Sequence, residues 1–298
     1  MKKINVALQD LTPFIPLPFI PFILLLLAIS CGRRETPKKL RIVSLSPAVT
    51  EIIYALKGEK NLAGVTNFCN WPKEVSGKER VGDFSFPSIE KIILLKPTKI
   101  FAAGPGQGKV LRSLGNLGYE IRIYHPETVD ELFKQISEIG TIIGEKKNAE
   151  KLLLKMKGEI KQIPKIKNKT VFIEVCSKPL IAASKPTFLS SVCRTLGLRN
   201  VCTLPHSYPQ INVEWLIKKK PDFILLTGTS VQEFLSIYPF FSGGKIISMT
   251  NPDILVRPGP RIVEGMWEIR WRISKLLGEK HTEKKPSPPY LRTPDAKK

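Results

Sequence analysis

Histidine is scarce in this chain of 298 residues, and no two cysteines have the spacing of a structural zinc site. The three histidines, His125, His206 and His281, stand far apart in the sequence. No serine lies in the glycine-flanked elbow of a hydrolase, and no histidine has an evident relation to a Ser or Cys nucleophile. We therefore expect no catalysis, no resident cofactor and no metal held by protein side chains.

Signatures of nucleotide and nucleic-acid binding are missing as well. The glycine-rich run from Gly104 to Lys109 has three residues between its outer glycines and Val110 after the lysine. A phosphate-binding loop needs four residues there and then Ser or Thr, so we interpret the run as a turn at the carboxyl end of a strand. There is no helix-turn-helix, zinc-finger or RNA-binding signature, and we expect no nucleic-acid partner.

The apolar run near the N-terminus is too interrupted for a stable membrane helix. It extends from Leu11 to Ser30, and only about Phe22 to Ile29 is free of its prolines, which are Pro13, Pro16, Pro18 and Pro21. Two lysines precede it and Cys31 follows it, which is the layout of a bacterial signal peptide ending at a lipid-modified cysteine, although Ala28 stands where leucine is usual. We expect residues 1–31 to form this signal, with lipidation at Cys31 and a linker over 32–39. An uncleaved N-terminal anchor is the alternative.

Four further cysteines would lie in an oxidising compartment if the chain is exported. They are Cys69, Cys176, Cys193 and Cys202, and four cysteines allow three pairings. Cys193 and Cys202 are the closest in sequence and make the favoured disulfide, while four buried free thiols are the alternative.

Basic residues exceed acidic residues along the whole chain. The 47 Lys and Arg and the 26 Asp and Glu give a net charge of +21. Such a charge fits attraction to anionic lipid headgroups, and a solvated basic surface is the simpler interpretation. The segment 279–298, rich in Lys and Pro, is predicted to be a disordered basic tail.

A helical stretch from Thr128 to Ile163 separates two similar halves. Apolar residues recur along it at steps of three and four, first from Val129 to Ile143 and again from Leu152 to Ile160. Gly144 and the charged residues 145–147 predict a break into two helices. The second, about 148–163, should carry the chain from one half to the other, and Pro164 should end it.

A short repeat relates the two halves. The segments 88–100 and 212–224 share a Glu at the third position and a Lys-Pro pair, with identical spacing. Each copy begins with a good N-cap residue, continues as a short helix and passes through Lys-Pro into an apolar strand.

Strands and helices alternate in both halves, which is typical of mostly parallel sheets. We predict an α/β fold of two doubly wound lobes joined by a single long helix. The N-terminal lobe is expected over 40–127, helices including the bridging helix over 128–163, and the C-terminal lobe over 164–278. Ligands of such sheets bind beyond the carboxyl ends of the strands, so the loops there should meet across one cleft.

Several motifs follow one another in order within residues 41–51, 64–72, 81–83, 90–97 and 257–261. Together they resemble those of the cobalamin-binding periplasmic proteins of ATP-driven importers, and the similarity extends from about Arg41 to Leu277. The ordered set is specific to the wider group of cobalamin, siderophore and haem binding proteins. The resemblance implies a lipoprotein on the periplasmic or extracytoplasmic face of a membrane. It would capture cobalamin or a related corrinoid and deliver it to an ABC permease dimer with its ATPase.

The resemblance gives a role to one acidic residue in each repeat copy. Glu90 and Glu214 match the family's acidic residues that dock with arginines of the permease, one lobe per subunit. Both are predicted in the first turn of a helix, at equivalent places, so a two-fold partner can contact both. Helix-dipole stabilisation of about 0.3 to 1 kcal/mol each is an alternative that needs no partner.

Aromatic residues are the main candidates for ligand contact, because their faces bury the flat apolar surface of a macrocycle while a few polar groups fix its orientation. The candidates are Phe68, Trp71, Phe84, Tyr208, Asp253 and Arg257. Phe68 and Phe84 fall at or near the family's aromatic positions, and Tyr208 replaces a frequent Trp. Beside Ala102 and Ala103, where the family has another aromatic, this chain has none. A ferric siderophore or haem as ligand, or a surface lipoprotein that uses the fold for adhesion, stay open as alternatives.

Overall fold

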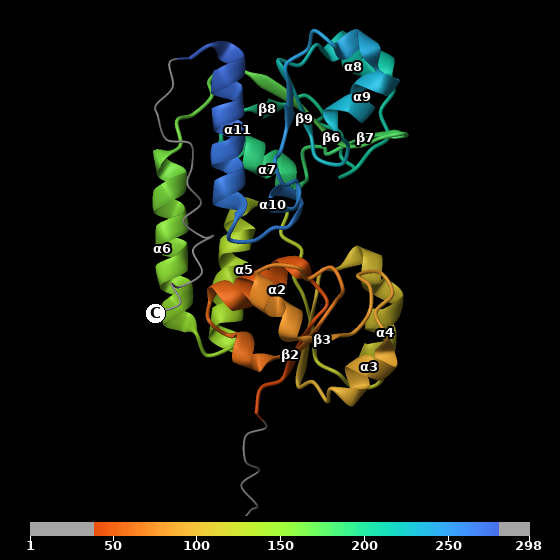
Figure 1. Cartoon of the computed structure of the whole chain (residues 1–298), viewed down its shortest axis with the longest axis vertical. Coiled ribbons are helices and arrows are strands. Elements are labelled where there is room, and N and C mark those ends of the chain that lie inside the picture. Colours follow the sequence, from red (N-terminus) through yellow and green to blue (C-terminus); the bar gives the residue numbers. More distant parts are fainter. Residues whose placement is uncertain (1–38, 280–298) are drawn as a thin grey trace, which may run out of the picture. The chain divides into compact units, whose positions relative to one another are not determined.

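Two β-sheets with helices packed against them make up the structure, a computed structural model that describes residues 39–279 (Figure 1). The sheet of the N-terminal lobe has five parallel strands in the order β3-β2-β1-β4-β5. These are β1 (Ile42–Ser44), β2 (Leu62–Val65), β3 (Glu79–Arg80), β4 (Lys99–Ala102) and β5 (Ile121–Ile123). Its helices are α2 (Pro47–Ala55), α3 (Ile89–Leu94) and α4 (Gly108–Asn116), with the 3₁₀ turns η2 (Glu59–Asn61), η3 (Lys73–Gly77) and η4 (Pro105–Gln107).

The sheet of the C-terminal lobe is mixed rather than fully parallel. Its order is β10-β9-β6-β7, and β8 also pairs with β6. Its strands are β6 (Thr170–Ser177), β7 (Leu180–Ala182), β8 (Arg199–Asn200), β9 (Phe223–Leu226) and β10 (Ile246–Ser248). Only β7 is antiparallel to its neighbour within the described residues. The helices of the C-terminal lobe are α7 (Phe188–Thr195), α8 (Val213–Lys219), α9 (Val231–Ile237), α10 (Asp253–Val256) and α11 (Ile262–Leu277), with the 3₁₀ turn η5 (Pro239–Phe241).

The helical stretch between the lobes is broken where the sequence predicts it. Helix α5 (Val129–Ile142) ends before Gly144, which adopts a φ of +76°, and α6 (Lys146–Gln162) follows. Near its start, Asn148 of α6 donates to the carbonyl of Leu56 (3.2 Å), and just beyond its end Arg270 of α11 donates to the carbonyl of Pro164 (3.1 Å). Helix α6 therefore carries the chain from the N-terminal to the C-terminal lobe, with α5 beside it (Figure 1).

The repeat is also visible in the backbone. Ser88 caps α3 by accepting a hydrogen bond from the amide of Lys91 (3.2 Å), and Asn212 caps α8 by accepting one from the amide of Glu214 (2.9 Å). The lysines before the two prolines, Lys96 and Lys220, adopt left-handed conformations with φ of 45° and 43°. Two short helices are thus started and stopped in the same way at equivalent places.

One apolar core extends through both lobes. It includes Ile52 of α2, Ile136 of α5, Met156 of α6, Val192 of α7 and Ile269 of α11, all at most 1% exposed. Two smaller clusters, one in each lobe, contain Ile100 of β4 and Ile224 of β9 respectively. Residues 40–279 accordingly belong to one compact unit, and the shared core resists separation of the lobes.

The predicted disulfide is wrong, since all four described cysteines are free thiols. Cys193 lies on α7 in the shared core, whereas Cys202 lies in the smaller core of the C-terminal lobe. The two residues are close in sequence but belong to different apolar clusters. Burial raises the pKa of the Cys193 thiol to about 12, so this thiol is unreactive at neutral pH.

The terminal predictions concern parts of the chain beyond the described range. The signal peptide, Cys31, the linker as far as residue 38, and the tail from residue 280 lie outside residues 39–279. Within that range, no helix is both long enough and apolar enough to span a bilayer.

Candidate ligand-binding site

A hollow of about 460 Å³, here called the interlobe pocket, lies between loops of the two lobes. Its lining residues are Pro47, Phe68, Asp83, Phe84, Ser85, Phe86, Asp253 and Arg257. The first six follow strands β1, β2 and β3 of the N-terminal lobe, and the last two precede α11 of the C-terminal lobe. The pocket thus lies beyond the carboxyl ends of parallel strands, where doubly wound sheets bind ligands.

A buried glutamine fixes the loop that supplies half of this lining. The side-chain amide of Gln107 donates hydrogen bonds to the carbonyls of Leu45 (2.7 Å) and Phe84 (2.9 Å), and its oxygen accepts one from the amide of Ala103 (3.0 Å). Asn67 donates a further bond to Asp83 (2.8 Å). Sequence reasoning missed Gln107 because this residue lies inside the glycine-rich run, which gave no sign of a side chain that points inward.

Aromatic side chains around the pocket are left largely in solvent. Phe68 is 52% exposed and Phe86 is 83% exposed, while Phe84 is half-buried. Exposed phenylalanines at the rim of a concave site lose the hydration of their apolar faces when a ligand covers them. The site therefore suits a ligand with a large flat apolar surface.

Two arginines of the C-terminal lobe clasp a glutamate of the N-terminal lobe. Arg261 makes two hydrogen bonds to the buried carboxylate of Glu51 on α2 (2.6 and 2.8 Å), and Arg257 lies 3.4 Å from the same carboxylate. The guanidinium of Arg261 also stacks on the ring of Trp71, 5.0 Å from its centroid. Burial raises the pKa of Glu51, and the charges of Arg261 and Arg257 oppose that rise. We call these four residues the interlobe clasp.

The structure brings four of the six predicted ligand-contact residues together at one pocket. Phe68, Phe84, Asp253 and Arg257 all line the interlobe pocket, but Arg257 is already engaged, with Asp253 at 2.7 Å and Asn70 at 2.6 Å. Its side chain is only 11% exposed. Phe86, Ser85, Asp83 and Pro47 line the pocket too and were not among the candidates, although Phe86 belongs to an aromatic-rich loop that the sequence shows.

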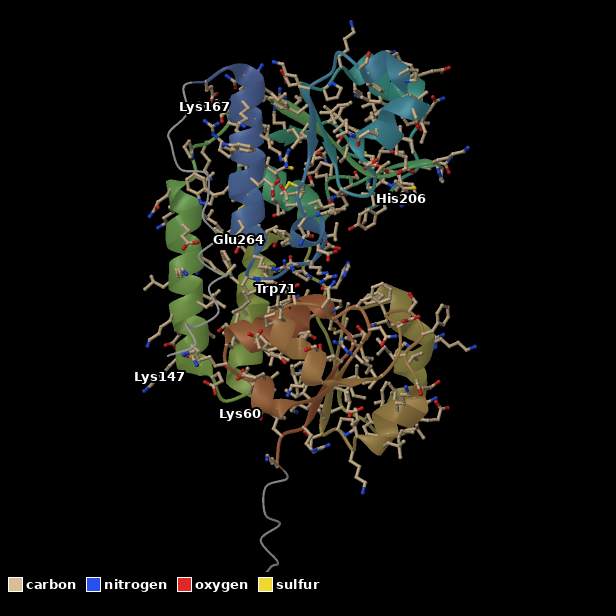
Figure 2. All side chains as sticks on the ribbon, in the orientation of Figure 1. Lys60, Trp71, Lys147, Lys167, His206 and Glu264 are labelled. Atoms are coloured by element: carbon tan, nitrogen blue, oxygen red, sulfur yellow. The ribbon has the colours of Figure 1, made fainter. Side chains whose placement is uncertain are left out.

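Trp71 and Tyr208 are not among the lining residues of this pocket. One face of Trp71 is covered by Arg261, and Figure 2 shows this residue where the two lobes meet. Tyr208 is 49% exposed on the loop that also carries His206, and His206 lies on the edge of the C-terminal lobe that faces the other lobe (Figure 2). No group of three or more His, Cys, Asp or Glu within residues 39–279 is arranged to hold a metal ion.

A second buried carboxylate lies close to the clasp. Glu264, in the first turn of α11, is 9% exposed, and its Oε1 atom has no hydrogen-bond partner in the described part of the chain. Burial raises the pKa of Glu264 to about 7, and the charge of Arg261 only partly opposes this rise.

Glu90 and Glu214 occupy equivalent positions on the two lobes. Each lies in the first turn of its short helix and is exposed. A hydrogen bond from its own backbone amide lowers the pKa of Glu90, and so does the bond that the Ser88 hydroxyl donates to its carboxylate (2.9 Å). Neither glutamate has an ion-pair partner between residues 39 and 279, so both present free negative charge.

Comparison with known proteins identifies the family. The family model described as periplasmic binding protein matches residues 42–241, about two-thirds of the chain. The chain belongs to the periplasmic binding protein family. The matched range includes both repeat copies and all six residues that line the N-terminal side of the interlobe pocket.

Relatives of this binding protein are similar over most of their length. An uncharacterized ABC transporter substrate-binding lipoprotein of Bacillus subtilis is 30% identical over 253 residues, which cover 79% of this chain and 80% of the relative. A vitamin B12-binding protein of Photorhabdus laumondii is 28% identical over 75% of this chain and 84% of its own. Among solved structures, a protein of Staphylococcus epidermidis described as a "possible" iron-binding, periplasmic solute-binding protein is 30% identical. It has a TM-score of 0.69 over 79% of this chain and 99% of its own.

Family membership confirms the two-lobed α/β fold and the general function predicted from the motifs. This is a substrate-binding protein of an ABC-type importer, from the group that takes up vitamin B12, siderophores and haem. Such proteins bind small ligands outside the cytoplasm and work with ABC permeases; they are not enzymes.

Proposed function

We propose that this binding protein captures cobalamin or a related corrinoid in the interlobe pocket and delivers it to an ABC permease. The observation that carries the proposal is the set of exposed phenylalanines at the pocket rim, Phe68 and Phe86, beside the half-buried Phe84. A corrin ring has the broad apolar faces that such side chains bury. Asp253 and Ser85 offer polar groups at the same rim for amide side chains of the ring.

Relatives named as vitamin B12-binding proteins support a corrinoid over other ligands of the group, since they match 75% to 83% of this chain at 24% to 28% identity. A ferric chelate is the second candidate, because the protein of Staphylococcus epidermidis that is described as a "possible" iron-binding protein is 30% identical. In either case the metal is part of the cargo. The macrocycle or chelator supplies its ligands, and no protein side chain is required to hold it.

The clasp limits how far the lobes move when ligand binds. Because Glu51 and Arg261 are buried and doubly hydrogen-bonded across the lobes, opening the cleft widely would break this ion pair and expose both charges. The shared core through α5 and α6 adds to this resistance. We therefore propose a small closure on binding rather than a wide hinge motion.

Delivery would use the two equivalent glutamates. Glu90 and Glu214 are exposed, carry unpaired charge within the described residues and are related by the repeat, so arginines of a two-fold permease can pair with both at once. The lipid on Cys31 would hold the protein near that permease. This anchor is supported by the signal layout and by the relative from Bacillus subtilis, which is named a lipoprotein.

A ligand panel tests the proposal. Purified protein is titrated with cyanocobalamin, haem and a ferric siderophore, and its thermal unfolding is followed at each concentration. At a hundred times the dissociation constant, a bound ligand stabilises the folded state by about 2.7 kcal/mol. We expect this stabilisation with cyanocobalamin. Stabilisation by haem or the siderophore alone would move the assignment to that ligand.

Two matched variants locate the site. Phe68→Ala combined with Phe86→Ala should weaken cyanocobalamin binding at least tenfold, because two exposed rings that cover the ligand are lost. Phe240→Ala, which removes a phenylalanine that is 55% exposed on the C-terminal lobe, should leave binding unchanged. No stabilisation by any of the three ligands would contradict the transport role and favour an adhesive surface lipoprotein.

A further inference from the structure

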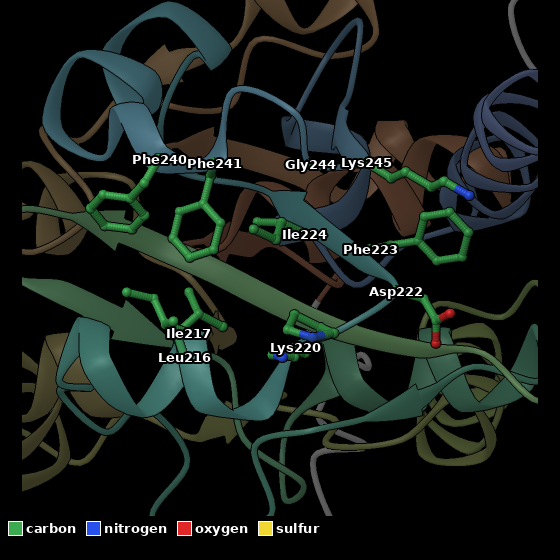
Figure 3. A pocket seen from close by; sticks show the side chains of 11 residues that line it. Leu216, Ile217, Lys220, Asp222, Phe223, Ile224, Phe240, Phe241, Gly244 and Lys245 are labelled. Carbon is green, nitrogen blue, oxygen red and sulfur yellow. The ribbon is translucent and has the colours of Figure 1, made fainter.

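A second hollow, of about 320 Å³, lies on the C-terminal lobe and shares no residue with the interlobe pocket. It is bounded by α8 on one side and by η5 with the following loop on the other, as Figure 3 shows. Phe223 and Ile224 begin strand β9, and Lys245 precedes β10. The hollow therefore lies at the amino ends of these strands, and the ligand of a doubly wound sheet binds at the opposite ends.

Two apolar side chains at this hollow are largely exposed. Phe240 is 55% exposed and Ile217 is 44% exposed, and they face each other from η5 and α8 (Figure 3). The ring of Phe240 is held in place by Phe241 and Tyr238, whose centroids lie 4.9 and 6.1 Å away. The fixed ring projects an apolar surface at little cost in conformational entropy.

Lysines surround these apolar groups. Lys218, Lys219 and Lys220 end α8, and Lys245 lies at the rim of the hollow; all four are exposed. Asp222 is the one acidic residue among those that line the hollow, and it is already bonded to Lys169 (2.9 Å) and Thr170 (2.7 Å). We call Ile217, Lys218, Lys219, Phe240 and Lys245 the Lys-Phe surface. It combines strong positive charge with an apolar centre.

The positive charge of the Lys-Phe surface determines what can bind there. The segment 280–298 has an excess of Lys and Arg over Asp and Glu, and a second copy of the chain carries a net charge of +21, so both are repelled by the lysines. The occupant must be anionic and must accept an apolar ring. The surface of a bilayer with acidic phospholipids has both properties, since aromatic and aliphatic side chains enter its headgroup boundary while lysines lie near the phosphates.

The position of Glu214 indicates which way the Lys-Phe surface faces. Glu214, Ile217 and Lys218 are spaced by three and four residues on α8, so they share one face of the helix. If Glu214 docks on a permease embedded in the membrane, a step that rests on the function proposed above, then Ile217 and Lys218 face the same membrane. We propose that the Lys-Phe surface binds anionic phospholipid beside the permease and orients the protein for docking.

The proposal is tested by measuring how the protein binds to vesicles when it lacks its own lipid anchor. A chain that lacks residues 1–31 is suitable, because residues 40–279 belong to one compact unit. Its binding is measured by co-sedimentation with vesicles of phosphatidylcholine alone and of phosphatidylcholine mixed with phosphatidylglycerol. We expect binding only to the mixed vesicles. Each lysine near an anionic surface contributes about fivefold to the binding constant, so Lys218→Gln, Lys219→Gln and Lys245→Gln together should weaken binding about a hundredfold.

Matched variants separate this surface from the general basic charge. Lys147→Gln, Lys151→Gln and Lys161→Gln remove three exposed lysines of α6 and should weaken binding less than fivefold. Phe240→Ala should weaken vesicle binding about tenfold without a change in charge.

Equal losses of vesicle binding for the two lysine sets would overturn the proposal in favour of diffuse electrostatic attraction. Normal vesicle binding by the Lys-Phe variants, with loss of binding to the purified permease, would overturn it in favour of a protein contact. Cyanocobalamin binding should be unchanged in all these variants, so a failed ligand assignment and a failed membrane assignment give different results.

Discussion

Replacement of Glu51 by Gln should destabilise the protein more than most single changes, because it breaks the interlobe clasp. The variant keeps the shape of the side chain but removes its charge. Arg261 then loses a doubly hydrogen-bonded carboxylate (2.6 and 2.8 Å), and its side chain, like that of Glu51, is less than 8% exposed to water. Removing one partner of a buried ion pair typically costs about 3 to 5 kcal/mol, because the other charge stays buried and unpaired.

The expected loss of stability in Glu51→Gln follows from the contacts that remain in the interlobe clasp. Arg257 keeps its contacts with Asp253 (2.7 Å) and Asn70 (2.6 Å), so only the environment of Arg261 becomes unfavourable. The amide oxygen of Gln can still accept one hydrogen bond from Arg261. The free energy of unfolding should therefore fall by about 3 kcal/mol, the lower limit of the range for a broken buried ion pair. In urea unfolding with a slope near 3 kcal/mol per molar, the midpoint should fall by about 1 M.

A second variant serves as a matched control for Glu51→Gln. Glu264→Gln also replaces a buried carboxylate near Arg261, but one with an unpartnered Oε1 within the described residues, so it should not destabilise the protein at pH 8. The double variant Glu51→Gln with Arg261→Gln should cost less than the sum of the two single changes, because the pair acts as a unit. A Glu51→Gln midpoint within about 0.2 M of the unmodified protein would refute the idea that the clasp holds the lobes.

Three further predictions concern other parts of the molecule. The pKa of Glu264 is raised to about 7 by burial, so the folded state keeps a proton that the unfolded state releases near pH 4.5. Stability should therefore fall as the pH rises from 4.5 to 7, by no more than about 3 kcal/mol, and Glu264→Gln should flatten this part of a stability-against-pH curve; an unchanged curve would rule out the raised pKa. Lys96→Gly should stabilise the protein by about 0.5 kcal/mol in denaturant unfolding, because relief of the left-handed conformation exceeds the added freedom of the unfolded chain, whereas Lys96→Ala should give no gain. Glu90→Lys with Glu214→Lys should abolish ligand-dependent uptake through the permease with ligand affinity intact, and normal uptake would exclude docking by these residues.

Local patterns in the sequence were sufficient for most helices and strands. The break at Gly144 and the course of α6 follow from apolar spacing and from residues that stop helices, and these signals act over a few positions. Strand β7 was missed, because three residues carry too little pattern to separate a strand from a loop. Its antiparallel pairing with β6 makes the second sheet mixed.

The candidate site was only partly predictable, because its key contacts join distant positions. Glu51 and Arg261 are separated by 210 positions, and neither residue has a neighbour in sequence that indicates the other. Trp71 was predicted as a ligand contact from its residue type, but packing covers one of its faces with Arg261. The pairing of Cys193 with Cys202 failed for the same reason, since nearness in sequence does not determine which core a side chain enters.

The apolar core that continues through α5, α6 and α11 has a consequence for engineering and for the evolution of ligand specificity. Neither half can be excised as an independent module, because a cut on either side of α6 would leave Met156 or Ile269 facing water. Chimeras that exchange whole halves between relatives must therefore carry these three helices as one block. Phe68 and Phe86 at the pocket rim, in contrast, lie outside that core and are exposed, so a new ligand can be accommodated by changing such rim residues alone.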